Sequence, residues 1–261
     1  MNFEILISTM HKDTNQVSEM LAIMNISCDA IVIVQGDFEG TDELKLKTGK
    51  AKIFYTKERG LSKSRNMALI NSNADIVLLS DDDLYYYDNF NKKILDSFNK
   101  SNGFDFIIFN LDNYNKTYPK KKGKVFFHNI LGFSSCQIAF KRQAVLDKGI
   151  FFNEGFGTGS GVYSSGEENI FLAQCYKYFK MLYVPEKILK RTESGSSWFT
   201  GYNEKYLFDR GAIFYAISNK IVWLLILQFA VRRKKLFPDY SFYKIVKLMV
   251  DGYLDSKRRL K

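Results

Sequence analysis

Histidine, proline and cysteine are all scarce in this chain of 261 residues. Its three prolines leave no proline-rich linker, and the two histidines, His11 and His128, lie too far apart in the sequence to form a metal-binding motif. The cysteines are Cys28, Cys136 and Cys175, without the spacing of a zinc site. So sparse a set, in a sequence without a recognisable signal peptide, predicts a protein of the reducing cytoplasm.

A long apolar run is also missing. The most apolar stretch, Ile221–Val231, has only about half of the roughly 20 residues that a membrane-spanning helix needs. The basic run Arg232–Lys235 follows it directly. Such a segment is typical either of a helix that lies on an anionic membrane or of a helix buried against the rest of the protein. The sequence alone leaves both readings open.

Positive charge is in excess, with a formal net charge of +10 at pH 7. This charge predicts an anionic partner, and a nucleotide sugar, a lipid surface and a nucleic acid all qualify. Nucleic acid is the weakest of the three, because no recognisable module interleaves basic with aromatic residues. The hydrophobic content of 46% is enough for the core of one large α/β domain with an extension.

The N-terminal half alternates segments typical of strands and of helices. This rhythm predicts an α/β fold with a single, mostly parallel, Rossmann-like sheet and flanking helices. We expect strands at residues 3–8, 30–34, 51–55, 76–80, 104–110, 136–140 and 181–184, the last ending at Pro185, and helices at 14–24, 62–70, 89–99, 142–147 and 167–179. Asp88 is placed to cap the third helix, and the basic loop 116–124 is expected to form the bend of a hairpin. From Tyr202 onward the sequence is typical of helices, so we predict a domain of residues 1–201 and a helical extension of residues 202–261, which either packs on the domain or binds membrane.

Three adjacent carboxylates, Asp81, Asp82 and Asp83, follow the apolar strand 76–80. Their charges repel one another, and a divalent cation would remove that penalty, since Mg²⁺ and Mn²⁺ prefer carboxylate oxygen and share their coordination shell with substrate phosphates. Ligands of α/β sheets usually bind at this carboxyl edge. The sequence therefore suggests a metal and diphosphate site, although a solvated acidic turn has the same composition.

Three further stretches carry chemistry. Gly60–Asn66 places a glycine, small hydroxyl residues, Lys63 and Arg65 at a helix start, where backbone amides and positive charge hold phosphate. Glu167 and Glu168 open a helix after a glycine-rich loop, where they either favour the helix dipole or supply a general base. The polar loop from Arg191 to Trp198 carries an aromatic ring that could stack on a sugar.

Taken in order, these stretches and the segment Phe152-Asn153-Glu154 resemble family 2 glycosyltransferases of the GT-A fold, over residues 3–198. The resemblance implies an inverting hexosyltransferase that moves a sugar from a nucleotide-diphosphate sugar, typically a UDP-sugar, to an acceptor hydroxyl, usually with Mn²⁺ or Mg²⁺. It also implies a role in bacterial cell-envelope polysaccharide synthesis of the capsular or O-antigen type. The acceptor implied is a glycan, on a lipid carrier at the inner face of the cell membrane.

The same resemblance implies a set of site residues. The family's DxD motif falls on Asp81–Asp83. We expect Asp83 to bind the metal and Asp81 to bind the metal or the ribose, and Asp82 could take either role. Glu168 is the implied base, with Glu167 beside it. The expected donor-binding residues are Thr9, Gln35, Asp37, Lys63, Arg65, Asp81 and Asp82, and the expected sugar or acceptor contacts are Trp198 and Arg191. At the end of the second strand the family usually has acidic residues that touch the nucleotide base. The matching stretch here is Val34-Gln35-Gly36-Asp37, in which Gln35 or Asp37 would serve, so the identity of the base stays open.

Two alternatives remain from the sequence. A sugar-nucleotide nucleotidyltransferase would require a glycine-rich nucleotide-binding loop with a basic residue near the N-terminus. The stretch Ser8–Lys12 is not such a loop. A non-catalytic basic module that binds membrane or nucleic acid would leave the acidic cluster a purely structural role.

Overall fold

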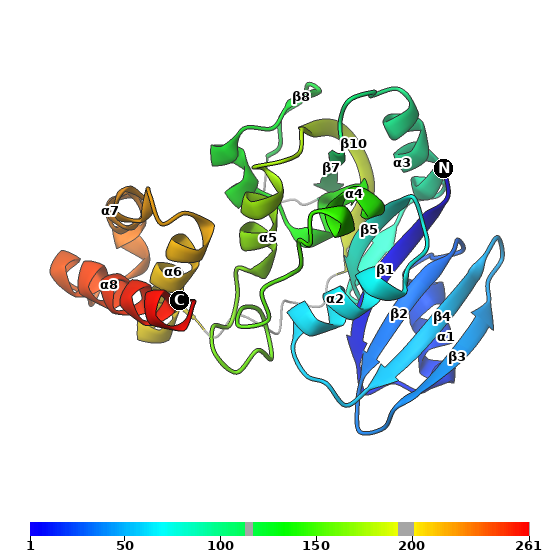
Figure 1. The fold of residues 1–261 in the computed structure, drawn as a ribbon, viewed down its shortest axis with the longest axis horizontal. Coiled ribbons are helices and arrows are strands. Elements are labelled where there is room, and N and C mark those ends of the chain that lie inside the picture. Colours follow the sequence, from blue (N-terminus) through cyan, green and yellow to red (C-terminus); the bar gives the residue numbers. More distant parts are fainter. Residues whose placement is uncertain (113–116, 193–200, 261) are drawn as a thin grey trace.

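The computed structural model describes residues 1–112, 117–192 and 201–260. Its centre is one mixed sheet with the strand order β3-β4-β2-β1-β5-β9-β7-β10-β6, and β8 pairs with β10 at the side (Figure 1). The strands are β1 (Phe3–Met10), β2 (Ala30–Gln35), β3 (Gly40–Lys45), β4 (Lys50–Thr56), β5 (Ile76–Asp81), β6 (Leu84–Tyr86), β7 (Phe106–Asp112), β8 (Gly123–Lys124), β9 (Ile138–Lys141) and β10 (Met181–Arg191). The α-helices are α1 (Thr14–Ile23), α2 (Leu61–Asn71), α3 (Phe90–Asn99), α4 (Arg142–Asp147), α5 (Glu167–Cys175), α6 (Glu204–Ile217), α7 (Val222–Arg233) and α8 (Phe242–Arg259). The 3₁₀ helices of the described residues are η1 (Phe127–Gly132), η2 (Ser135–Gln137) and η3 (Lys234–Leu236).

The neighbouring strands β4, β2, β1 and β5 run parallel, with Ile5 of β1 in register with both Ala30 and Leu78. Side chains alternate across a strand, so Ile5 and Ile7 face a core shared with α1 and α3, whereas Leu6 faces a core shared with α2, α4 and α5. Burial on both faces explains the continuous apolar runs in these strands. The predicted α/β fold with flanking helices is confirmed.

Several local predictions need correction. The helix α3 begins at Phe90 after Asn89, which takes a left-handed conformation (φ 58°), and Asp88 instead accepts a hydrogen bond from Asn25. The last strand does not end at Pro185, because β10 continues through two register irregularities to Arg191 and pairs with β6 there. A proline fits a strand where a bulge already interrupts the ladder.

The expected hairpin around the basic loop is also wrong: β8 pairs with β10, which lies far along the chain. Helix α5 ends at Cys175 rather than at Phe179. Strands β3 and β6 were not expected from the sequence. β3 is an exposed and largely charged edge strand, and β6 is only three residues long, so neither carries an apolar pattern that sequence periodicity would find.

The helices α6, α7 and α8 form a layer beside α5, drawn yellow to red in Figure 1. Their inward side chains join the same apolar core as the sheet. Gly211 of α6 and Gly252 of α8 let these two helices touch closely, because a Cβ atom at Gly211 would lie 1.8 Å from the carbonyl oxygen of Met249. Within the described residues no helix is long and apolar enough to cross a membrane.

Candidate active site

A cavity of about 810 Å³ opens at the carboxyl ends of the parallel strands. Thr9 comes from the end of β1, Gln35 from the end of β2, and Asp81 from the end of β5. Carboxyl ends of parallel strands meet at one edge of the sheet, which is why residues far apart in the sequence share one wall. Other parts of the wall come from the glycine-rich loop before α5, from α5 itself and from the start of α6.

The three aspartates at the end of β5 have different partners. Asp81 Oδ1 accepts a hydrogen bond from Arg65 Nη2 at 3.0 Å. Asp82 Oδ2 accepts from Thr9 Oγ1 at 2.5 Å and from Lys12 Nζ at 3.1 Å. Burial and the negative charge of Asp81 raise the pKa of the half-buried Asp83 carboxyl. Asp82 is therefore already engaged, while Asp83 carries an electrostatic penalty that a cation would relieve.

Arg65, in the second turn of α2, connects two walls of the cavity. The residue is 2% exposed, and its guanidinium donates to Glu167 Oε1 at 2.9 Å as well as to Asp81 and to Ser135 Oγ. Burial alone would lower the pKa of Arg65, but the carboxylates of Asp81 and Glu167 outweigh it and raise the pKa. The side chain stays charged and links the aspartate strand end to the glutamate pair.

Glu167 and Glu168 open α5 directly after Gly166. Gly166 has φ 91°, and an added Cβ would lie 2.6 Å from Ile213 of α6, so only glycine fits this cap. Glu167 is buried against Arg65. Burial and the negative charge of Glu167 raise the pKa of Glu168 to about 8. A carboxyl group with a pKa near neutral pH, on the wall of a cavity, has the properties of a general base.

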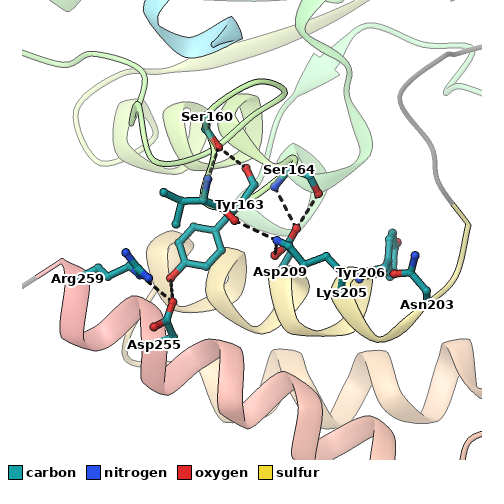
Figure 2. Close-up of polar contacts among 10 residues, drawn as sticks. Ser160, Tyr163, Ser164, Asn203, Lys205, Tyr206, Asp209, Asp255 and Arg259 are labelled. Carbon is teal, nitrogen blue, oxygen red and sulfur yellow. Dashed lines mark hydrogen bonds and ion pairs between the residues drawn. The ribbon is translucent and has the colours of Figure 1, made fainter. Parts of the chain in front are cut away.

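The loop that carries the glutamate pair is tied to its surroundings on two sides. Toward the sheet, Ser62 Oγ of α2 donates to the carbonyl oxygen of Phe156 at 2.7 Å. Toward the C-terminal helices, Tyr163 donates to Asp255 of α8 at 2.7 Å, and the amide and hydroxyl of Ser164 donate to Asp209 of α6 at 3.0 and 2.6 Å (Figure 2). The C-terminal helices therefore help to hold the loop of the candidate active site.

The other expected site residues divide into two groups. Gln35, which donates to the carbonyl oxygen of Gly60 at 3.1 Å, and Arg191 line the cavity with Thr9 and the aspartates. Asp37 does not line it: its carboxylate is exposed and pairs with Arg59 at 2.9 Å. Lys63 pairs with Glu58 and lines a smaller neighbouring hollow. Trp198 lies outside the described residues.

The sequence interpretation did not anticipate two parts of the wall. One is Ser134 and Ser135, at the start of η2, where Ser135 accepts a hydrogen bond from Arg65. The other is the start of α6, with Lys205, Tyr206 and Arg210. Isolated serines carry no sequence signal. The four-residue spacing of Tyr206 and Arg210 indicates a shared helix face, but not that this face meets a site.

The carboxylate oxygens at the edge of the cavity fit a divalent cation bound together with a substrate. Among the described residues no three His, Cys, Asp or Glu side chains form a metal-binding group. Asp81 and Asp83 nevertheless offer hard oxygen ligands at one cavity edge, where burial and the charge of Asp81 raise the pKa of Asp83. Mg²⁺ typically takes one or two carboxylates, with water and substrate phosphates completing its coordination.

Solved structures with a similar fold include those of S. aureus TarS. For residues 1–349 in complex with UDP-GlcNAc, the TM-score is 0.61 at 14% identity, and the alignment covers all of this chain and 93% of that one. For the same segment in complex with UDP, the TM-score is 0.57 at 17% identity, with 83% and 65% covered. For TarS itself the TM-score is 0.58 at 16% identity, and the chain spans 39% of its length. The TarS segment in complex with UDP is thus matched over less than two thirds of its length. At identities of 14 to 17%, the similarity establishes the shared fold alone.

Among curated proteins, none matches this chain. The sequence model of glycosyl transferase family 2 matches residues 28–160, about half of the chain. The matched segment contains Gly60–Asn66 and the three aspartates and ends before the glutamate pair. With the fold and the cavity at the strand ends, this match shows that the chain belongs to glycosyl transferase family 2.

Proposed function

We propose that the protein transfers a sugar from a nucleotide-diphosphate sugar, specifically a UDP-sugar, to an acceptor hydroxyl with inversion at the anomeric carbon. The observation that carries the proposal is the Arg65 link, which holds Asp81 and Glu167 at two walls of one cavity. A transferase needs a site for the departing diphosphate and a base for the acceptor within reach of each other. The TarS structures with UDP and UDP-GlcNAc support the choice of donor class.

The donor binds, in this proposal, along the strand ends. Thr9 and Asp82 are held together by their hydrogen bond, and Gln35 lies buried at the end of β2, so these polar groups are arranged before the nucleotide arrives. Asp37 and Lys63 would have to leave Arg59 and Glu58 to take part, which makes them the weakest members of the donor set. Arg191, on the cavity wall, contacts the donor sugar or the acceptor together with Trp198.

Asp83 and Asp81 would hold Mn²⁺ or Mg²⁺. When bound, the metal would neutralise the negative charge that develops on the departing diphosphate. Asp82 is held by Thr9 and Lys12 and contributes to the ribose or to the cation. Arg65 acts as a positioning residue, since its guanidinium is engaged with Asp81, Glu167 and Ser135.

Glu168 is the general base in this mechanism. Its carboxylate takes the proton of the acceptor hydroxyl while that oxygen attacks the anomeric carbon. The bond from this carbon to the diphosphate oxygen breaks, and the electron pair leaves with the nucleoside diphosphate. Attack on the face opposite the leaving group inverts the configuration. The raised pKa of Glu168 makes its carboxylate a stronger base than an ordinary glutamate.

The acceptor is, in this proposal, a lipid-linked glycan of capsular or O-antigen type at the inner face of the cell membrane. On α7 the residues Val222, Leu225, Ile226 and Ala230 are buried in the core, whereas Trp223, Leu224, Leu227 and Val231 are exposed. The basic run Arg232–Lys235 follows. An exposed apolar helix face beside clustered positive charge favours peripheral binding to anionic lipid, and residues 202–261 would then form the membrane-associating extension of a catalytic domain 1–201.

Calorimetric titration with UDP, GDP and CDP, with and without Mn²⁺, tests the donor and metal parts together. We expect metal-dependent binding of UDP, lost in Asp83→Ala and retained in the control Asp239→Ala, whose exposed carboxylate lies outside the cavity. Transfer is then measured with a panel of UDP-sugars on the wild type. If none of the three nucleotides bound under either condition, the proposed function would be wrong.

A further inference from the structure

The start of α6 forms a basic and aromatic part of the cavity wall. Tyr206, Arg210 and Ile213 follow one another at intervals of four and three residues, so they share one face of the helix. Ile213 contacts Gly166, the residue before the glutamate pair. The same helix face therefore extends from the start of α5 along the cavity, where Tyr206 and Arg210 line the wall.

Among the described residues, no carboxylate pairs with Arg210, which is held in place by aromatic rings and a hydroxyl. Its Nη2 donates to the hydroxyl of Tyr206 at 2.9 Å, and its guanidinium lies over the rings of Tyr206 and Phe229 with 4.9 and 5.9 Å to the ring centroids. Its Nε is buried and donates no hydrogen bond within the described residues. The neighbouring Lys205 differs, because its ammonium group is engaged with Asp209 and with the carbonyl oxygen of Val162.

A guanidinium on a cavity wall that pairs with no carboxylate among the described residues is suited to an anion. Phosphate is the usual partner, because its oxygens match the fork of an arginine. This wall comes from α6, whereas the diphosphate of the donor is assigned to the ends of the parallel strands. An anion at Arg210 therefore belongs to the second substrate.

We propose that Arg210, supported by Tyr206, binds a phosphate group of the acceptor, so that the acceptor is a phosphate-bearing molecule. The inference rests on the proposed function, since it assigns the second substrate of the same site. A phosphate linked to lipid is the favoured source. Phe229, over which Arg210 lies, belongs to α7, and α7 also carries the exposed apolar residues Trp223, Leu224 and Leu227. A lipid chain leaving the phosphate would have this apolar helix nearby.

Binding of small phosphate probes tests the assignment directly. Geranyl phosphate, inorganic phosphate and geraniol are titrated against the full chain, with the donor site filled by UDP and Mg²⁺. Arg210→Gln removes the guanidinium, Arg210→Lys keeps the charge, and Arg233→Gln removes an exposed positive charge at the end of α7 as the matched control. Thermal unfolding of each variant is measured alongside, so that loss of folding is recognised.

We expect geranyl phosphate to bind the wild type and the Arg233→Gln control alike. Its affinity should fall at least about tenfold in Arg210→Gln and less in Arg210→Lys, because a charge-assisted hydrogen bond is lost in the first and partly replaced in the second. Geranyl phosphate binding more tightly than inorganic phosphate supports the lipid source, and equal binding of the two supports a soluble phosphate at the same arginine.

Equal affinity of geranyl phosphate for the wild type and a folded Arg210→Gln variant would overturn the proposal, as would no binding to the wild type. Binding of geraniol as tight as that of geranyl phosphate would overturn it too. The proposed function fails separately, through absence of UDP binding. In that case the titrations are run without UDP, and the comparison of Arg210→Gln with Arg233→Gln still decides the role of Arg210.

Discussion

Arg65 Nη1 lies 2.9 Å from Glu167 Oε1, and these two buried residues are 102 positions apart in the sequence. The same guanidinium holds Asp81, 3.0 Å from Nη2. One side chain thereby sets the position of the aspartate strand end relative to the glutamate-bearing helix α5. The geometry of the site therefore includes a contact between residues that lie far apart in the sequence.

Replacing Arg65 with methionine should destabilise the protein strongly. The change leaves Glu167 buried without its positive partner, and breaking a buried ion pair in this way costs about 3–5 kcal/mol. The free energy of unfolding in urea measures the loss. Arg59→Met is the control, because the ion pair of Arg59 with Asp37 is exposed and worth no more than about 1 kcal/mol. Equal losses in the two variants would contradict the structural role of Arg65.

Replacing Glu168 with glutamine should lower the rate of transfer about 10²–10⁴-fold, because the acceptor proton loses its base. UDP binding should stay within about twofold, since Glu168 is not among the donor-binding residues. For the wild type, kcat/KM should rise with pH and level off above about 8, where the free enzyme carries the carboxylate. A variant that keeps the wild-type rate, or a wild-type profile that falls over this range, would remove Glu168 from the base position.

The same substitution should stabilise the fold at neutral and higher pH. The pKa of Glu168 is about 8 when folded, against 4.5 for an ordinary glutamate. Between these values the unfolded chain releases a proton that the folded chain keeps, so the wild type loses stability as the pH rises. The Tm of Glu168→Gln should therefore exceed that of the wild type by a margin that grows from about pH 4.5 and levels above about pH 8. Thermal unfolding across this range checks the sign, and a margin independent of pH would refute it.

Replacing Gly211 with alanine should destabilise the C-terminal helices, although the same change usually stabilises a helix. The added Cβ would lie 1.8 Å from the backbone carbonyl oxygen of Met249, so α6 and α8 must move apart. Overpacking of this kind costs about 1–3 kcal/mol. Urea unfolding is compared with Gly123→Ala, at a position where an added Cβ meets no atom within 4 Å. A Gly211→Ala variant as stable as the control would show that the helix pair is not packed as described.

Replacing Trp223, Leu224 and Leu227 together with serine should weaken binding to anionic vesicles at least about tenfold, since the apolar contact with lipid is lost. Flotation of the full chain with phosphatidylglycerol vesicles at low and high salt measures this binding. The control replaces three exposed apolar residues elsewhere, Ile23, Ile70 and Tyr178, with serine. Cutting the chain after Asn203 is a poorer test, because α6 to α8 complete the core. Equal flotation of the two triple variants would exclude α7 as the membrane contact.

Periodicity and turn residues alone were enough to predict the α/β fold. Residues 76–81 illustrate this, because apolar residues buried on both faces of a parallel strand form an unbroken run, and the run ends where the aspartates begin. The resemblance to family 2 glycosyltransferases is confirmed, while the roles of the individual site residues stay predictions. Strands β3 and β6 were not predicted, because edge strands and very short strands carry little apolar pattern.

The sequence by itself determined which chemical groups stand at the strand ends and helix starts, because local periodicity places these ends. Only the tertiary structure decided how the groups are paired. In the folded protein Asp82 is hydrogen-bonded to Thr9 and Lys12. Arg65 connects Asp81 with Glu167, and Arg210 lines the cavity wall. Such pairings depend on how helices and strands pack across a shared core, and packing between distant segments leaves no periodic signal in the sequence.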